Sequence, residues 1–230
     1  MDHSHQAAPL AGANGAGARP YRAVTGLSVA ATVLILLSLL YSVLLTVSDW
    51  RVYLVVEHYL AGTATLEEAQ SADDFSSFFT WWKGLLVIVA AGVVFLVWLW
   101  RARINAESLG GPDSQRRVRG WVVGSWMTPV ANLWIPYLIV TDIWKASAPR
   151  RSAPGALLVV WWGAWVIGGY VGQSYTYLVM KDSLTEDDLR RAVYLSTVST
   201  VLYVLAGVLI LYTVHRISTW QTLRRPAPTG

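Results

Sequence analysis

The sequence predicts an all-α integral membrane protein, a four-helix bundle with a proline-broken interfacial or re-entrant cytoplasmic segment between its second and third spans. Three observations predict this class. Hydrophobic residues make up 54% of the 230-residue chain and charged residues only 14%, whereas a soluble domain carries about 25% charged residues. The chain has four long apolar stretches, and most of its basic residues fall on one side of them.

Each of the four stretches has the length of a membrane-spanning helix, which crosses a hydrocarbon core of about 30 Å at about 1.5 Å per residue. They are residues 23–47, 78–100, 155–180 and 192–214. The first is too long for a cleavable signal peptide and lacks a small-x-small cleavage pattern, so we expect an uncleaved anchor. Tryptophans at the ends of the second are expected in the aromatic belts of the membrane: Trp81, Trp82, Trp98 and Trp100.

The basic residues predict the orientation. With four spans, 13 of the 18 Lys and Arg residues fall on the side of both termini and the loop 101–153, which places that side in the cytoplasm. These 13 are Arg19, Arg22, Arg101, Arg103, Arg116, Arg117, Arg119, Lys145, Arg150, Arg151, Arg216, Arg224 and Arg225. Residues 21–221 then form the membrane domain, between a tail 1–20, predicted to be disordered, and a tail 222–230.

The segment 113–147 is apolar, yet it is not predicted to cross the membrane. If residues 121–144 formed a fifth span, the basic residues would divide 10 to 8 and lose their bias. Pro129 and Pro136 would interrupt helical hydrogen bonding, and Asp142 at mid-membrane would cost about 2.5–3.5 kcal/mol. We therefore expect this segment to lie at the cytoplasmic interface or to enter the membrane as a re-entrant hairpin.

Helix signals subdivide this segment. The sequence predicts helices near 113–127 and 133–147 with a break across 128–132. Thr128, which precedes a proline, has the form of an N-cap, and Asn132 is a candidate cap for the next helix.

Capping residues mark two helix starts outside the membrane. "TLEE" (65–68) predicts the start of a short external helix. "TEDD" (185–188) predicts the start of the last helix and places three acids on its first turn, where the helix dipole favours negative charge.

Two motifs, "FLVWLWRARINAESL" (95–109) and "GWVVGSWMTPVANLWIPYLIVTDIWKAS" (120–147), resemble the bacterial membrane-protein family of unknown function labelled DUF 4328. The order of the spans also fits, so the resemblance covers roughly residues 21–215. It implies a bacterial cytoplasmic membrane protein and supplies no activity. Family members more often carry an aromatic residue before the first proline and a basic residue in the following helix, where this chain has Met127-Thr128 and the uncharged run 138–141.

Polar residues that follow the second span are the first candidates for a functional site. Arg101 and Asn105 are four residues apart and share a helix face, as do Arg103 and Glu107. One interpretation is the end of a membrane span with one surface ion pair. The alternative is that Arg101 or Asn105 packs against the proline break, whose exposed carbonyls need donors, or binds an anionic head group.

Two polar side chains lie within the proline-broken segment. Asn132 is interpreted as a helix cap or a binding residue, and Asp142 as a structural partner of Lys145 or a functional acid. The family motif adds further candidates, which are Trp121, Pro129, Trp134, Pro136, Tyr137 and Trp144.

Several kinds of site are not expected. The chain has no cysteine, which excludes disulfides, thiolate metal sites and a cysteine nucleophile. The four histidines are dispersed and predict no metal site, and no cofactor is expected. There is no Gly-x-Ser-x-Gly pattern for a serine nucleophile, and a net charge of +4 is too small to indicate nucleic-acid binding.

The sequence therefore predicts a non-enzymatic membrane module that binds a lipid head group or a membrane-protein partner, in an oligomeric state that it does not specify. The alternative is a membrane-embedded enzyme acting on a lipid or an apolar small molecule, with Arg101, Asn105, Glu107 and Asp142 as its polar groups. A transporter is disfavoured because the spans carry almost no charge to line a path. Convergence of these polar groups on one buried pocket would favour the enzyme, and their dispersal would favour the binding module.

Overall fold

The computed structural model confirms the all-α class, because its described residues form helices and turns and contain no strand. The described residues are 21–65, 67–68, 70–72, 74, 81–149, 155–181, 183 and 185–224. The predicted tail 1–20, most of the tail 222–230, the beginning of the second span and the basic pair Arg150-Arg151 lie outside them.

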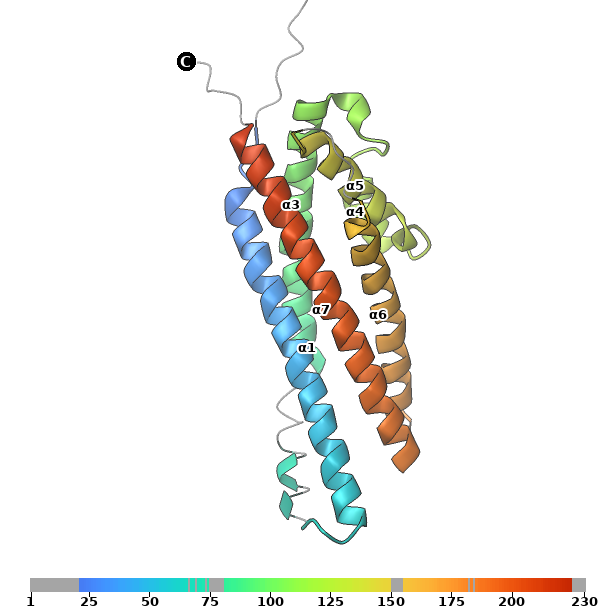
Figure 1. The fold of residues 1–230 in the computed structure, drawn as a ribbon. Coiled ribbons are helices and arrows are strands. Elements are labelled where there is room, and N and C mark those ends of the chain that lie inside the picture. The colour runs from blue at the N-terminus through green and yellow to red at the C-terminus, as the bar shows by residue number, and fades with distance from the viewer. Residues whose placement is uncertain are drawn as a thin grey trace, which may run out of the picture.

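Four long helices run alongside one another in Figure 1: α1 (Thr25–Leu60), α3 (Trp81–Gly110), α6 (Leu157–Val179) and α7 (Glu186–Leu223). Of the described helices, α1, α3 and α7 are long and apolar enough to cross a membrane, as expected of a membrane protein. With 36 residues at about 1.5 Å each, α1 is about 54 Å long and exceeds a hydrocarbon core of about 30 Å. Several turns of α1 therefore continue beyond its predicted span.

Short elements fill the chain between α3 and α6. They are η1 (Pro112–Ser114), α4 (Trp121–Met127), η2 (Ala131–Leu133) and α5 (Ile135–Ser147). The predicted break is confirmed, since α4 ends at Met127, before Pro129, and α5 begins only at Ile135, with Pro136 in its first turn. The helix predicted near 113–127 is wrong over its first half, which is a 3₁₀ turn and loop preceding α4.

The helices do not form a symmetric bundle. α7 packs against both α1 and α6, α1 also packs against α3, and α5 contacts α3, α6 and α7. The short elements between α3 and α6 lie at one end of the molecule, together with the start of α1 and the end of α7 (Figure 1). Much of the buried core is at this end, and its fully buried side chains include Trp98, Leu99, Ile139, Ile143, Leu158, Val214 and Ile217.

Trp98 corrects the predicted aromatic belt. It is fully buried, and its Nε1–H donates to Ser218 Oγ at 2.9 Å, so it joins α3 to α7 inside the protein. Trp82 and Trp100 are exposed, as side chains in a belt would be. The length of an apolar stretch does not reveal which face meets another helix, and this explains the error.

Small residues allow close helix contacts. A Cβ added at Gly168 would lie 3.2 Å from Leu202, and one at Gly172 would lie 3.0 Å from Ser199 Oγ, so these glycines of α6 face α7. The α7 residue that meets them is Ser199, whereas Ser196 contacts α1 through Thr46. The backbones of α6 and α7 can thus approach closely.

Candidate functional site

A buried amide on α3 connects three parts of the chain. Asn105 is 1% exposed and accepts a hydrogen bond from the Arg22 backbone N–H at 2.8 Å. Its Nδ2 donates to the Arg22 carbonyl at 2.8 Å and to Gln221 Oε1, on α7, at 3.1 Å. Asn105 thus satisfies both backbone groups of a residue just before α1 and holds the start of α1 against α3 and α7.

Gln221 extends this connection to α5. Its fully buried side chain donates from Nε2 to the Ala102 carbonyl and to Ser147 Oγ, both at 2.8 Å. Arg224 donates to the Ala146 and Ser147 carbonyls at 3.3 and 3.1 Å. The last carbonyls of a helix lack intrahelical partners, so the end of α7 caps α5.

Arg101 and Asn105 do not serve the proline break, which corrects their predicted role. Arg101 Nη1 donates to the Ala23 carbonyl at 3.0 Å, and the hydrogen bonds of Asn105 go to Arg22 and Gln221. Their shared helix face is turned toward the start of α1 and not toward α4. Helical spacing predicted that the two side chains act together, but it does not specify the neighbouring element.

Glu107 lies between two guanidinium groups. Arg103 Nε and Arg119 Nε each lie 3.0 Å from a Glu107 carboxylate oxygen, and Arg103 also donates to the Arg117 carbonyl. The pair predicted to be on the surface is buried instead: Arg103 is 3% exposed. The cluster fixes the loop before α4 onto α3. One Arg103 nitrogen, Nη1, is buried and has no hydrogen-bond partner among the described residues.

Asp142 pairs with a distant arginine, so Lys145 is not its partner. The Arg116 guanidinium lies 2.8 Å (Nη2) and 2.9 Å (Nε) from Asp142 Oδ1, and the Arg116 backbone N–H donates to Oδ2 at 3.2 Å. This carboxylate hydrogen bond raises the pKa of Arg116 above its ordinary value. Asp142 is buried on α5 whereas Lys145 is exposed, which corrects the predicted pair.

The proline break has few side-chain caps. Thr128 ends α4, where its hydroxyl donates to the Gly124 carbonyl, and so it does not begin a helix as predicted. Asn132 is not the N-cap of α5, and its Oδ1 is buried with no hydrogen-bond donor in the part of the chain that the structure describes. Pro136 is buried in the first turn of α5, where its missing N–H costs no helical bond, and Pro129 is exposed.

The aromatic candidates are dispersed. Trp121 and Tyr137 are half-buried against the core, and Trp134 is 45% exposed. Trp144 is buried, with its ring centroid 4.7 Å from that of Trp220, in an edge-to-face contact between α5 and α7. These four residues therefore do not form one site.

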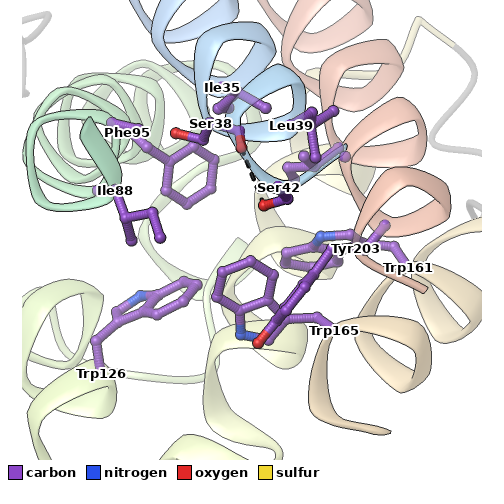
Figure 2. A pocket seen from close by; sticks show the side chains of 15 residues that line it. Ile35, Ser38, Leu39, Ser42, Ile88, Phe95, Trp126, Trp161, Trp165 and Tyr203 are labelled. Carbon is purple, nitrogen blue, oxygen red and sulfur yellow. Dashed lines mark hydrogen bonds between the residues drawn. The ribbon is translucent and has the colours of Figure 1, made fainter. Parts of the chain in front are cut away.

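A cavity of about 370 Å³ lies between the long helices. α1, α3, α6 and α7 line it, and α4 contributes Trp126. Most of the lining is apolar; its larger or polar members include Phe95, Trp126, Trp161, Trp165, Tyr203 and Ser42 (Figure 2). The volume falls within the range of about 300–1,000 Å³ that is typical of ligand pockets.

Trp126 closes the cavity on the side of α4. Its ring makes edge-to-face contacts with Phe95 at 5.9 Å and with Trp162 at 5.7 Å between centroids. Trp162 in turn donates from Nε1 to the Leu133 carbonyl at 2.7 Å, which fixes the break to α6. The Trp126 ring lines this apolar space, while its Nε1 is buried and has no hydrogen-bond acceptor within the described residues.

The cavity contains none of the residues predicted from the sequence. Arg101, Asn105, Glu107 and Asp142 lie in separate hydrogen-bonded groups, and the lining residues come from the spans and from Trp126. The family motif "GSWMTPVANLW" contains Trp126, so the motif was a signal for this residue. Apolar side chains that line a cavity have the same pattern as those that face lipid, and sequence reasoning missed them.

Comparison with known proteins gives one match. No curated protein and no solved structure matches the chain. A family model described as "Domain of unknown function (DUF4328)" matches residues 61–219, a range that begins after α1 and includes Trp126, the proline break and most of α7. Because the match covers more than half of the chain, this protein belongs to the DUF4328 family.

Proposed function

We propose that this protein is a four-span membrane protein that binds an apolar ligand, such as the chain of a lipid, in the cavity between its helices. The cavity of about 370 Å³ carries this proposal. Its apolar lining suits an aliphatic chain.

The proposal places α6 across the membrane with α1, α3 and α7. α6 has 23 residues, which gives a length of about 35 Å, enough for a hydrocarbon core of about 30 Å. None of its 23 residues is charged. Both described ends of the chain lie on one side (Figure 1), and the excess of basic residues there supports a cytoplasmic location for that side.

In this arrangement, α4, η2 and α5 form a re-entrant hairpin. Trp126 of α4 contacts Phe95, which is six residues before Arg101 on α3 and therefore about 9 Å deeper along that helix. The turn of the hairpin exposes large apolar side chains, which are Met127, Val130, Leu133 and Trp134. Such a surface is favourable in contact with lipid and costly in water.

A ligand can enter from the bilayer. The cavity is partly open at the surface of the helices. α5 contacts both α3 and α6 at the cytoplasmic end, but α3 and α6 are not closely packed against each other along their length. A lipid chain could therefore reach the cavity from the side without crossing a polar region.

The arrangement supports binding over the enzymatic alternative. Asp142 and Glu107 are each neutralised by arginine, and Asn105 is fully engaged by Arg22 and Gln221. A general acid or base has to reach the proton that it transfers, and these groups do not line the cavity. Their dispersal is the outcome expected of a binding module.

The test is mass spectrometry of lipids and metabolites on protein purified in native nanodiscs, with a cavity-filling variant. Gly92 lines the cavity, and a Cβ added there meets no atom within 4 Å, so Gly92→Leu occupies the space with little strain. Gly163→Leu is the matched control, because Gly163 is also half-exposed with open space but does not line the cavity. We expect Gly92→Leu to lower one co-purifying apolar ligand at least tenfold and Gly163→Leu to retain it. Identical profiles for the wild type and both variants would overturn the proposal.

A further inference from the structure

A second polar cluster lies toward the end of α1 that is far from the termini. Asp49 of α1 is half-buried, and its carboxylate accepts hydrogen bonds from Tyr175 Oη at 3.0 Å and from Ser196 Oγ at 2.5 Å. Tyr175 belongs to α6 and Ser196 to α7, so three helices meet at this acid. In the part of the chain that the structure describes, no ion pair joins Asp49 to a basic side chain.

Further hydroxyl groups continue the cluster along the α1–α7 contact. Thr46 Oγ1 lies 3.1 Å from Ser196 Oγ and 2.8 Å from Thr200 Oγ1. Thr200 Oγ1 donates to the Ser42 carbonyl at 3.5 Å. Carboxylate, hydroxyl and carbonyl oxygens from three helices are therefore gathered in one place, without any nitrogen donor among them.

Asp49 differs from the other half-buried or buried acids of the described residues because its hydrogen-bond partners are uncharged. Asp142 and Glu107 each have an arginine, and Asp188 has Lys181 at 3.0 Å, whereas Asp49 has only neutral partners. Asp49 lies two residues after the predicted span 23–47, and a carboxylate held between helices is costly unless a positive charge balances it. The structure thus provides ligands for a positive charge, and none of the described residues supplies that charge to Asp49 through an ion pair.

We propose that the Asp49 cluster is a binding site for a small monovalent cation, with Na⁺ as the ion that fits its chemistry. Hard oxygen ligands suit alkali and alkaline-earth cations, and one carboxylate balances one positive charge. Ca²⁺ takes six to eight oxygens, commonly from several carboxylates, and the cluster has only one. The bound ion joins α1, α6 and α7 through Asp49, Tyr175 and Ser196.

The test is thermal unfolding of the full chain in detergent at constant ionic strength, with NaCl replaced stepwise by choline chloride. The wild-type melting temperature is expected to rise with Na⁺ and to saturate. Asp49→Asn should abolish the Na⁺-dependent rise. Glu57→Gln removes the same charge from an exposed position on the same helix and should retain it.

A second variant keeps the test decisive if Asp49→Asn does not fold. Ser196→Ala leaves the carboxylate in place and removes one hydroxyl ligand, so the half-saturating Na⁺ concentration should rise at least tenfold while saturation is still reached. Broadening of the ²³Na resonance by the wild type, lost in Ser196→Ala at low Na⁺, is the direct measure of binding. Equal stabilisation by choline and Na⁺ would overturn the proposal. So would stabilisation that follows acidification and not Na⁺, because Asp49 would then bind a proton.

Discussion

Replacing Asn105 by alanine tests the connection between the start of α1 and the rest of the molecule. Asn105 makes three hydrogen bonds, two with the backbone of Arg22 and one with Gln221 Oε1. Alanine removes all three. It also leaves the Gln221 acceptor in a fully buried position, where water cannot replace the lost donor.

The expected cost follows from these contacts. Each hydrogen bond contributes about 1 kcal/mol net, so the loss of three lowers the free energy of unfolding by about 3 kcal/mol. Arg101→Ala is the comparison, because Arg101 lies one turn earlier on the same helix and makes a single exposed hydrogen bond to the Ala23 carbonyl. Arg101→Ala should lower the free energy of unfolding by less than about 1 kcal/mol.

Reversible unfolding in mixed detergent–SDS micelles, followed by tryptophan fluorescence and circular dichroism, measures both variants. We expect Asn105→Ala to be less stable than Arg101→Ala by about 2 kcal/mol or more. Equal stabilities would refute the reasoning, because they would show that the hydrogen bonds to Arg22 and Gln221 add nothing beyond the helix end.

Three further substitutions test other contacts. Glu107→Gln leaves the 3%-exposed Arg103 charge without its carboxylate, and we expect a loss of about 3–5 kcal/mol in the free energy of unfolding. Gly84→Ala places a Cβ against the ring of Tyr41, which must shift, and should cost about 1–3 kcal/mol. Thr185→Ala removes the observed capping box of α7 and should cost about 1 kcal/mol, detected as a lower melting temperature in detergent.

Matched controls separate these effects from general damage. Gly163→Ala adds a methyl group where no atom lies within 4 Å and should leave stability unchanged or slightly raised. Arg190→Ala should cost less than Glu107→Gln, because the side chains of Arg190 and its partner Asp187 are 56% and 65% exposed and water replaces the lost contact. If Gly163→Ala were as damaging as Gly84→Ala, close packing against Tyr41 would not be the cause.

The sequence by itself determined the local features of this protein. Apolar length predicted where the long helices lie, and prolines predicted the break before α5. The capping box predicted at residues 65–68 was also confirmed, since Thr65 and Glu68 make the reciprocal hydrogen bonds. The predicted start of the last helix was confirmed too, since α7 begins at Glu186 with three acids on its first turn. All of these signals depend on interactions within a few residues, which is why a sequence pattern can specify them.

Only the tertiary structure decided which polar groups meet. Asp142 binds Arg116, 26 residues away, in preference to Lys145 in the same helix, and Asn105 binds Arg22, 83 residues away. The cavity beside Trp126 and the oxygen cluster at Asp49 are likewise formed by residues from several helices. Helical periodicity places a side chain on a face, but the rotation and crossing of neighbouring helices decide what that face contacts. In a membrane protein, the lipid-facing and cavity-facing sides are equally apolar, so hydropathy cannot distinguish them.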